Sequence, residues 1–269
     1  MMKTNTNIFI ILLFASILYS CDNELDETVY SRLAQSNVFE SEEGVQALSY
    51  SAYANSSYPT IYLHITWDEW PTGLSLQTGG GLNDAVPMQD FTWTADHGFL
   101  SFIHWTPAWN TIRDCNLLLE GIDDSPLENI IKSRIKSEAI FLRAKAYYDL
   151  YLLFGPVPLR INNDQPFELP RESEEVMVAF IENEMIAAIN GLPESVSDNE
   201  YGRLSKWSAR AFLDKVYLNT KQWQKSADLG LEIINSNKYS LFPSYEDLFK
   251  VENERNSEYI YVAPKTSKE

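Results

Sequence analysis

The chain has 269 residues, of which 45% are hydrophobic and 22% are charged, a composition typical of folded globular proteins and not of disordered ones. Its formal net charge of −17 at pH 7 opposes binding to the phosphate backbone of nucleic acids and to anionic lipid headgroups. We therefore expect no nucleic-acid partner, and the length allows one large hydrophobic core or two smaller ones.

The N-terminal residues carry the features of an export signal. An apolar run over residues 8–18 is too short for a comfortable transmembrane helix but suits the core of a secretory signal peptide. Residues 18–21, Leu-Tyr-Ser-Cys, resemble the bacterial lipobox, in which cleavage precedes a cysteine that becomes acylated. We therefore predict a lipoprotein signal peptide over residues 1–20 and lipid attachment at Cys21. A plain signal peptide cut nearby, or an anchor helix, is the alternative.

Acidic residues follow Cys21 at once, a pattern that resembles the export tag of surface lipoproteins in the Bacteroidetes. On this interpretation residues 21–37 form an acidic tether, and the lipid anchors the protein in the outer membrane with the protein facing the cell exterior. Cys115 is then the cysteine left beyond the anchor. It lies in a helical pattern with no histidine near it in sequence, so we expect a buried core thiol and not a nucleophile.

Residues 38–269 are predicted to form one helical domain with a loop-rich insertion. The first helix should open near Ser41 and end near Tyr58. The expected buried face of this helix carries Val45, Leu48, Ala52 and Tyr53.

The insertion, at about residues 60–104, lacks helical or strand periodicity and is rich in glycine, proline, asparagine and aspartate. A structureless stretch of this length is usually either disordered or functional. Disorder fits poorly, because the stretch and its border are dense in large rings. These rings are Trp67, Trp70, Phe91, Trp93, Phe99, Phe102 and Trp105. We interpret the segment as an ordered binding region.

The longest predicted helix runs from Ser125 to Phe154 and organises the fold. Ser125 is suited to cap its first turn and Gly155 to end it. From Phe141 onward almost every face of this helix is apolar, and a helix that is apolar all round must be covered all round. We therefore expect it to lie between neighbouring helices, one of which starts at Thr106.

Further helices are predicted over about 173–191, 205–219 and 221–236. The first should be capped by Ser173. Its expected inward residues are Val176, Phe180, Met185, Ala188 and Ile189, and the last helix has its apolar residues at Trp223, Ala227, Leu231 and Ile234. Residues 144–149 match residues 209–214 in chemical type, at an offset near two tetratricopeptide periods. Stacked helix pairs interlock small alanines with large rings in this way, so we predict a solenoid. A chance match is the alternative.

The last part of the chain starts a new unit. Residues 258–262 alternate like a β-strand, but no partner strand is evident in the sequence. We interpret this as a chain that ends within a larger architecture.

Several motifs follow one another along the chain. They are residues 138–144, 147–150, 154–159, 202–206 with 209–217, then Trp223 with Ala227, and finally residues 239–241 with Tyr245 and 248–249. Together with the lipobox they resemble the SusD/RagB family of outer-membrane glycan-binding lipoproteins. The resemblance extends from the lipobox to Val262, which is essentially the whole mature chain.

This resemblance implies a mostly α fold, a tetratricopeptide-like helix-pair solenoid with an aromatic-rich loop region. It also implies cell-surface binding of an oligosaccharide, a polysaccharide or a similar nutrient. The nutrient is delivered to a TonB-dependent, SusC-like outer-membrane transporter, over which the protein sits as a lid. Family members do no chemistry on the nutrient, so we expect no enzyme activity, no cofactor and no metal. Members are usually about twice as long, which implies that the C-terminal half is missing from this chain.

The family places an aromatic platform in the loops before a helix that here carries Trp105 and Trp109. Sugar C–H faces stack on aromatic rings, while the hydroxyl groups need polar partners beside the ring. The residues that match this site are Phe91 and Trp93, with Asp96 and His97 behind them, Trp70 in the same aromatic region, and Asn83 and Asp84 as partners for hydroxyl groups. For each ring, the alternative is packing in the core.

Other chemistry finds little support in the sequence. The three histidines, His64, His97 and His104, lack the spacing of metal ligands, and the glycines at 79–81 lack the lysine and flanking elements of a phosphate-binding loop. In the longest helix, Glu138 and Arg143 are expected to form structural ion pairs with neighbouring helices.

The second hypothesis is a tetratricopeptide-type scaffold that binds a peptide or protein and has no sugar site. Glycan binding predicts that at least two rings among Trp70, Phe91 and Trp93 are exposed on one face. The scaffold hypothesis predicts that these rings are buried and that the helices form a concave groove instead.

Overall fold

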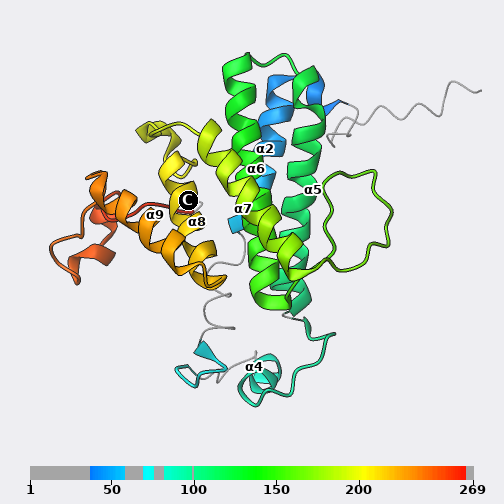
Figure 1. Ribbon diagram of the computed structural model, residues 1–269, viewed down its shortest axis with the longest axis vertical. Coiled ribbons are helices and arrows are strands. Elements are labelled where there is room, and N and C mark those ends of the chain that lie inside the picture. The colour runs from blue at the N-terminus through cyan, green and yellow to red at the C-terminus, as the bar shows by residue number, and fades with distance from the viewer. Residues whose placement is uncertain (1–36, 58–68, 76–81, 99, 265–269) are drawn as a thin grey trace, which may run out of the picture. The chain divides into compact units, whose positions relative to one another are not determined.

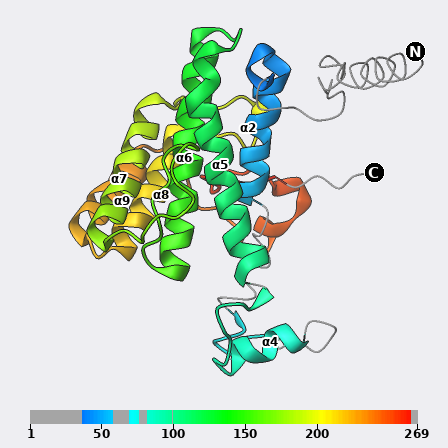
Figure 2. The same ribbon diagram turned by 90° about the vertical axis from the view of Figure 1, so that its right-hand side faces the viewer.

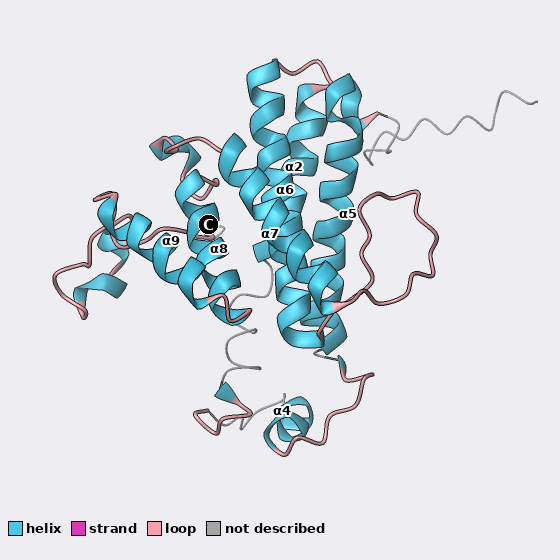
Figure 3. Cartoon of the chain, viewed as in Figure 1, coloured by secondary structure: helices cyan, strands magenta, loops and turns pink. Residues whose placement is uncertain are grey.

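The computed structural model describes residues 37–57, 69–75, 82–98 and 100–264. Within these ranges the chain forms helices joined by loops and turns, without a β-strand (Figure 3). No helix in these ranges is both long and apolar enough to cross a membrane. The predicted signal peptide and the predicted lipid attachment site, Cys21, lie outside the described residues.

Helices from distant parts of the chain pack into one array (Figure 1). The longer ones are α2 (Glu42–Ser57), α5 (Thr106–Gly121), α6 (Asn129–Phe154), α7 (Glu174–Gly191), α8 (Lys206–Asn219) and α9 (Trp223–Asn235). From α5 to α9 each helix packs against the next, and α2 lies against both α5 and α6 (Figure 2). This succession of neighbouring helices confirms the predicted solenoid of helix pairs.

Helix α6 is the central element, but it starts later than predicted. It begins at Asn129, and Glu128 at its N-cap has extended backbone with no side-chain capping bond. Ser125 instead donates from its hydroxyl to the carbonyl of Ile122, at 2.7 Å, and so closes the short 3-10 turn before the helix. The predicted cap at Ser125 is therefore wrong. The predicted end is correct, since Gly155 follows the helix with a φ of +69°.

Aromatic side chains of α6 pack against three neighbouring helices. The ring of Tyr147 meets Trp109 of α5 and Phe180 of α7 edge-on, at centroid distances of 6.0 and 5.3 Å. Phe141 meets Phe212 of α8 in the same geometry at 5.2 Å. Both Tyr147 and Phe141 are fully buried. Each edge-to-face pair contributes about 0.5–1.5 kcal/mol beyond the burial of apolar area. Because the geometry of such pairs is specific, they favour these neighbouring helices over other arrangements.

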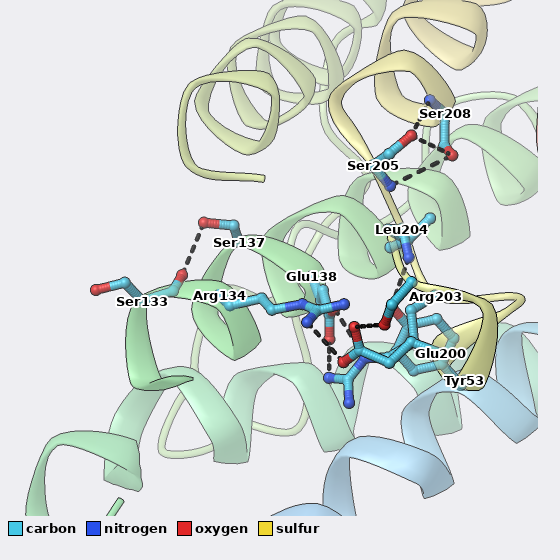
Figure 4. A network of polar contacts seen from close by, with 11 residues as sticks. Tyr53, Ser133, Arg134, Ser137, Glu138, Glu200, Arg203, Leu204, Ser205 and Ser208 are labelled. Atoms are coloured by element: carbon cyan, nitrogen blue, oxygen red, sulfur yellow. Dashed lines mark hydrogen bonds and ion pairs between the residues drawn. The ribbon is translucent and has the colours of Figure 1, made fainter. Parts of the chain in front are cut away.

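The charged residues of α6 form structural ion pairs, as predicted. Glu138, which is 1% exposed, accepts hydrogen bonds from Arg134 at 3.1 Å and from Arg203 at 2.6 Å (Figure 4). Arg134 also reaches Glu200 at 2.7 Å, so the pairs join α6 to the turn before α8. Arg143 pairs with Glu184 of α7 at 2.7 Å. Each buried charge thus has a partner of opposite sign, which offsets part of the cost of its burial.

The predicted buried face is wrong on α9 and largely correct on α7. On α7, Met185 and Ala188 are buried and Phe180 and Ile189 pack against the core, but Val176 is 45% exposed, and the buried residues of the first two turns are Met177 and Ile181. On α9 the apolar stripe is exposed, with Trp223, Leu231 and Ile234 at 60%, 55% and 71%. Helix α9 packs through the neighbouring face, where Leu229 meets the core and Ser226 donates to Asp214 of α8 at 2.7 Å.

The end of the described chain, where the sequence alternates like a strand, has no regular secondary structure. Tyr261 turns its ring into the core, where it meets Phe212 edge-on at a centroid distance of 5.0 Å. The alternating sequence therefore reflects one side chain anchored on the helices, because the described residues offer no neighbouring strand.

Cys115 of α5 is fully buried, as predicted, and burial raises the pKa of its thiol well above the ordinary value.

Candidate functional site

The described part of the aromatic region consists of residues 69–75 and 82–98. The first piece is a tight turn, in which the amides of Gly73 and Leu74 donate to the carbonyls of Trp70 and Glu69 at 3.2 and 3.1 Å. Gly73 has a φ of +75°, a conformation that glycine adopts without steric cost. The side chain of Gln89 donates to the carbonyl of Ser75 at 3.3 Å and so connects the two pieces.

A short helix, α4 (Leu82–Gln89), lies in a stretch where the sequence predicts only loop. Its apolar residues Ala85 and Met88 are buried, and they follow a helical spacing. Pro87, inside the helix, is the residue that argues against it, because proline lacks the amide donor of a helix interior. The hydrogen bond lost at Pro87 is the one to the carbonyl of Asn83, and burial of Ala85 and Met88 helps to maintain the helix despite this loss.

Helix α4 ends in a motif that normally uses glycine. Phe91 has a φ of +56°, and the amide of Thr92 donates to the carbonyl of Pro87 at 2.9 Å. This is the hydrogen bond of a Schellman end, with Phe91 in the left-handed position. A left-handed residue with a side chain costs about 1–2 kcal/mol. Strain of this kind clusters at functional sites, where surrounding structure maintains it.

The left-handed turn brings Phe91 and Trp93 together. Their ring centroids lie 5.4 Å apart with an angle of 45° between the planes. Phe91 is 63% exposed, while Trp93 is half-buried. Phe91 therefore presents an exposed ring, and Trp93 contacts it from a partly buried position.

Trp70 supports this pair from the interior. It is 5% exposed and forms a small hydrophobic cluster with Ala85 and Met88, against which Trp93 packs. Trp70 thus lies in the predicted cluster, but its ring is covered in this structure. Ala85 and Met88 were not among the predicted site residues, although their spacing and apolar character were available in the sequence.

The polar residues behind the rings are fixed by a local turn. The hydroxyl of Thr94 donates to the carboxylate of Asp96, and the amide of His97 donates to the carbonyl of Thr94 at 3.0 Å. The hydrogen bond from Thr94, together with the backbone of Asp96 itself, lowers the pKa of that carboxyl below its ordinary value. Asp96 is exposed and His97 is half-buried. An ionised, exposed carboxylate accepts hydrogen bonds from hydroxyl groups of a ligand.

Asn83 and Asp84 lie on the first turn of α4, and their side chains are outside the described part of the structure. The described residues therefore bring together Phe91, Trp93, Asp96 and His97 at the surface, with Trp70 beneath. In the same described ranges, no group of three or more His, Cys, Asp or Glu side chains is arranged to hold a metal ion.

A protein-family model provides the decisive comparison. The model of a SusD-like family described as "Starch-binding associating with outer membrane" matches residues 23–218, well over half of the chain. The chain belongs to the SusD-like family. This result confirms the resemblance on which the sequence analysis rests.

Curated relatives of this SusD-like chain cover most of it. A SusD-like protein of Formosa agariphila is 23% identical over 96% of the chain and 51% of its own length. A SusD-like protein of Bacteroides ovatus is 28% identical over 58% of the chain and 31% of its own length. The chain spans about half the length of the first of these relatives.

Solved structures confirm the fold. A SusD-like protein of Bacteroides fragilis superposes with a TM-score of 0.74 at 23% identity, covering 88% of this chain and 47% of that one. A protein titled "Laminarin binding SusD-like protein" superposes with a TM-score of 0.74 at 26% identity, covering 83% of this chain and 51% of that one. The mostly helical fold predicted from the sequence is therefore the fold of the family.

Proposed function

We propose that this SusD-like protein binds a glycan at the cell surface and delivers it to a TonB-dependent, SusC-like outer-membrane transporter, without doing chemistry on it. The observation that carries the proposal is the pair of contacting rings, Phe91 and Trp93, followed in the chain by the exposed carboxylate of Asp96. A neighbour in fold is titled as laminarin-binding, and the description of the family supports a place at the outer membrane. The proposed anchor is a lipid on Cys21, with the protein facing the exterior.

The geometry suits a sugar in two respects. The exposed face of Phe91 offers apolar surface to the C–H face of a pyranose ring, and Trp93 stiffens that face because it packs on Trp70 and Met88. Asp96 lies near in sequence and is ionised, so it accepts hydrogen bonds from sugar hydroxyls beside the ring. His97 is a second proposed partner, and Asn83 and Asp84 are proposed partners on the neighbouring helix.

The alternative function, a scaffold for a peptide or protein without a sugar site, expects the three rings to be buried. Phe91 is 63% exposed, Trp93 is only partly exposed and Trp70 is buried. Neither the two exposed rings expected for glycan binding nor the three buried rings expected for the scaffold is therefore found. The glycan proposal is supported by the exposed ring of Phe91 together with its contact to Trp93. Burial of Trp70 limits the proposed platform to two rings, and Trp70 then has a supporting role beneath them.

Affinity electrophoresis in gels that contain laminarin, xyloglucan or starch tests the proposal. We expect the wild-type chain to be retarded by at least one of these glucans. Phe91→Ala and Trp93→Ala should each weaken binding about tenfold, because each removes part of a stacking surface worth roughly 1–2 kcal/mol.

Trp223→Ala is the matched control, since Trp223 is a 60% exposed ring on α9, outside the proposed site. Equal loss of retardation in Trp223→Ala and Phe91→Ala would contradict the assignment of the site. Absence of retardation of the wild type by glucans, and by a wider panel of plant and host polysaccharides, would contradict the proposed function.

A further inference from the structure

The loop between α6 and α7, residues 155–173, is the longest connection among helices α5 to α9 and contains no helix or strand. Loops of this length without secondary structure are usually functional or disordered. This α6–α7 loop is anchored at its start. The hydroxyl of Tyr147 donates to the carbonyl of Arg160 at 2.8 Å and accepts from the amide of Arg160 at 2.7 Å. Asn163 adds a bond from its amide to Glu120 of α5 at 2.7 Å.

The tip of the loop is held from within by one guanidinium group. Arg160 donates to the carbonyls of Gln165, Pro166 and Phe167, at 2.9, 2.8 and 3.0 Å. The side chain of Gln165 in turn accepts from the amides of Ile161 and Asn162, at 2.6 and 3.1 Å. The backbone at the tip is therefore fixed by hydrogen bonds that do not depend on any packing of its apolar side chain.

This fixed backbone presents a phenylalanine to solvent. Phe167 is 95% exposed, the largest exposed fraction among the large hydrophobic residues of the described chain. Pro166 and Glu168 on either side are also exposed, so the ring stands at a convex tip. Because the backbone is already held, binding through Phe167 would cost mainly the freedom of its ring, which suits an interface anchor.

The surroundings of Phe167 favour a protein partner over a sugar. A sugar site needs polar side chains beside the ring, but Arg160 and Gln165 are occupied in holding the loop. A convex tip also offers no cleft to enclose a ligand, whereas it fits into a pocket of another protein. The charged residues next to the tip, Asp164 and Glu168, are exposed and acidic, in a chain of net charge −17. A second copy of this chain would therefore be repelled, and a basic surface attracted.

We propose that the α6–α7 loop is a protein-docking loop, in which Phe167 inserts into an apolar pocket whose rim carries lysine or arginine side chains. The inference rests on the proposed function for the choice of partner, because it assigns this contact to the outer-membrane transporter.

The test measures the affinity of the full mature chain for a SusC-like TonB-dependent transporter from the same organism, purified in detergent, by microscale thermophoresis. Phe167→Ala should weaken binding about tenfold or more, as expected for an aromatic anchor. Arg160→Lys, which keeps the ring and the charge but loses the fork that holds three carbonyls, should weaken it to a smaller extent. Ile130→Ala is the matched control, since Ile130 is a 74% exposed apolar residue on α6, and its affinity should stay within about twofold of wild type.

Several outcomes would overturn the docking loop. These are no binding of the transporter to the wild-type chain, equal affinity of wild type and Phe167→Ala, and equal losses for Phe167→Ala and Ile130→Ala. A wild-type dimer in light scattering that Phe167→Ala dissociates would assign the loop to self-association instead.

Retardation by glucans, measured on the same preparations, separates the two proposals. We expect Phe167→Ala to bind glucan like the wild type, and a loss there would place the ring in the glycan site and overturn the docking loop. A chain that binds the transporter through Phe167 but no glycan would contradict the proposed function alone.

Discussion

At the scale of single residues, Phe91 combines two properties that oppose one another. Its left-handed backbone is a position for which glycine is the usual choice, while its ring is the exposed half of the proposed platform. Because the ring contributes little to the core, its retention in a strained position supports a role in binding. The sequence could suggest Phe91 as an aromatic residue near Trp93, but its backbone conformation depends on where α4 ends.

We therefore predict that substitutions at residue 91 affect the stability of the protein and its affinity for glucan differently. The free energy of unfolding of Phe91→Gly should exceed that of Phe91→Ala by about 1 kcal/mol, because glycine adopts the positive φ without strain and alanine does not. Both variants should lose affinity for glucan to the same extent. Urea denaturation followed by circular dichroism measures the first quantity. Equal stability of the two variants would contradict the left-handed assignment.

At the scale of elements, the periodicity of the sequence predicts a helix better than it predicts which face is buried. Helices α2 and α8 match the expected ranges within one residue, and α5 starts where expected, because their apolar residues repeat at helical spacing after clear start signals. On α7 only the first residue of the face was misplaced, since Val176 and Met177 are both apolar and only packing distinguishes them. On α9 the most regular stripe faces solvent, because Leu229 and Ser226 meet α8 instead.

For the proposed glycan site, too, the sequence predicts which residues lie together better than it predicts which of them are buried. Trp70, Phe91 and Trp93 were predicted together from their chemistry, and all three do lie in one region. Which ring is covered depends on Ala85 and Met88 of α4. That helix was not predicted, because Pro87 and the neighbouring glycines are typical of loops.

Two leucines on adjacent helices provide a matched test of the packing. Leu213 of α8 is 4% exposed, whereas Leu231 of α9 is 55% exposed. Leu213→Ala should lower the free energy of unfolding by about 2–5 kcal/mol through loss of burial and formation of a cavity. Leu231→Ala should change it by no more than about 0.5 kcal/mol. Chemical denaturation of both variants decides this, and a large effect of Leu231→Ala would mean that the stripe on α9 is covered in solution.

At the scale of the whole molecule, the stability of the fold should depend on pH through a buried histidine. His104 is 4% exposed, and its burial lowers its pKa from 6.5 to about 4. The unfolded chain therefore binds a proton between these two values that the folded chain does not bind. Stability should fall as the pH decreases from about 6.5 to 4, by at most about 3 kcal/mol.

His104→Gln should flatten this part of the pH profile, because glutamine does not titrate. Thermal unfolding of the wild type and of His104→Gln at half-unit pH steps measures this dependence of stability on pH. Carboxyls with lowered pKa, such as Asp96 and Asp123, lose their contribution at lower pH, near and below their ordinary pKa of 3.8. A profile that keeps its slope between pH 4 and 6.5 in His104→Gln would contradict the assignment to His104.

The burial of Cys115 has a practical consequence for studying this protein in solution. Its thiol is fully enclosed within α5 and its pKa is raised, so alkylating reagents should reach it only when the chain unfolds. Among the described residues it is the sole native sulfhydryl. In a chain that starts after Cys21, a cysteine introduced at an exposed loop position would therefore accept a fluorophore or spin label selectively, without prior removal of Cys115. Distances from that label to a partner could then be measured.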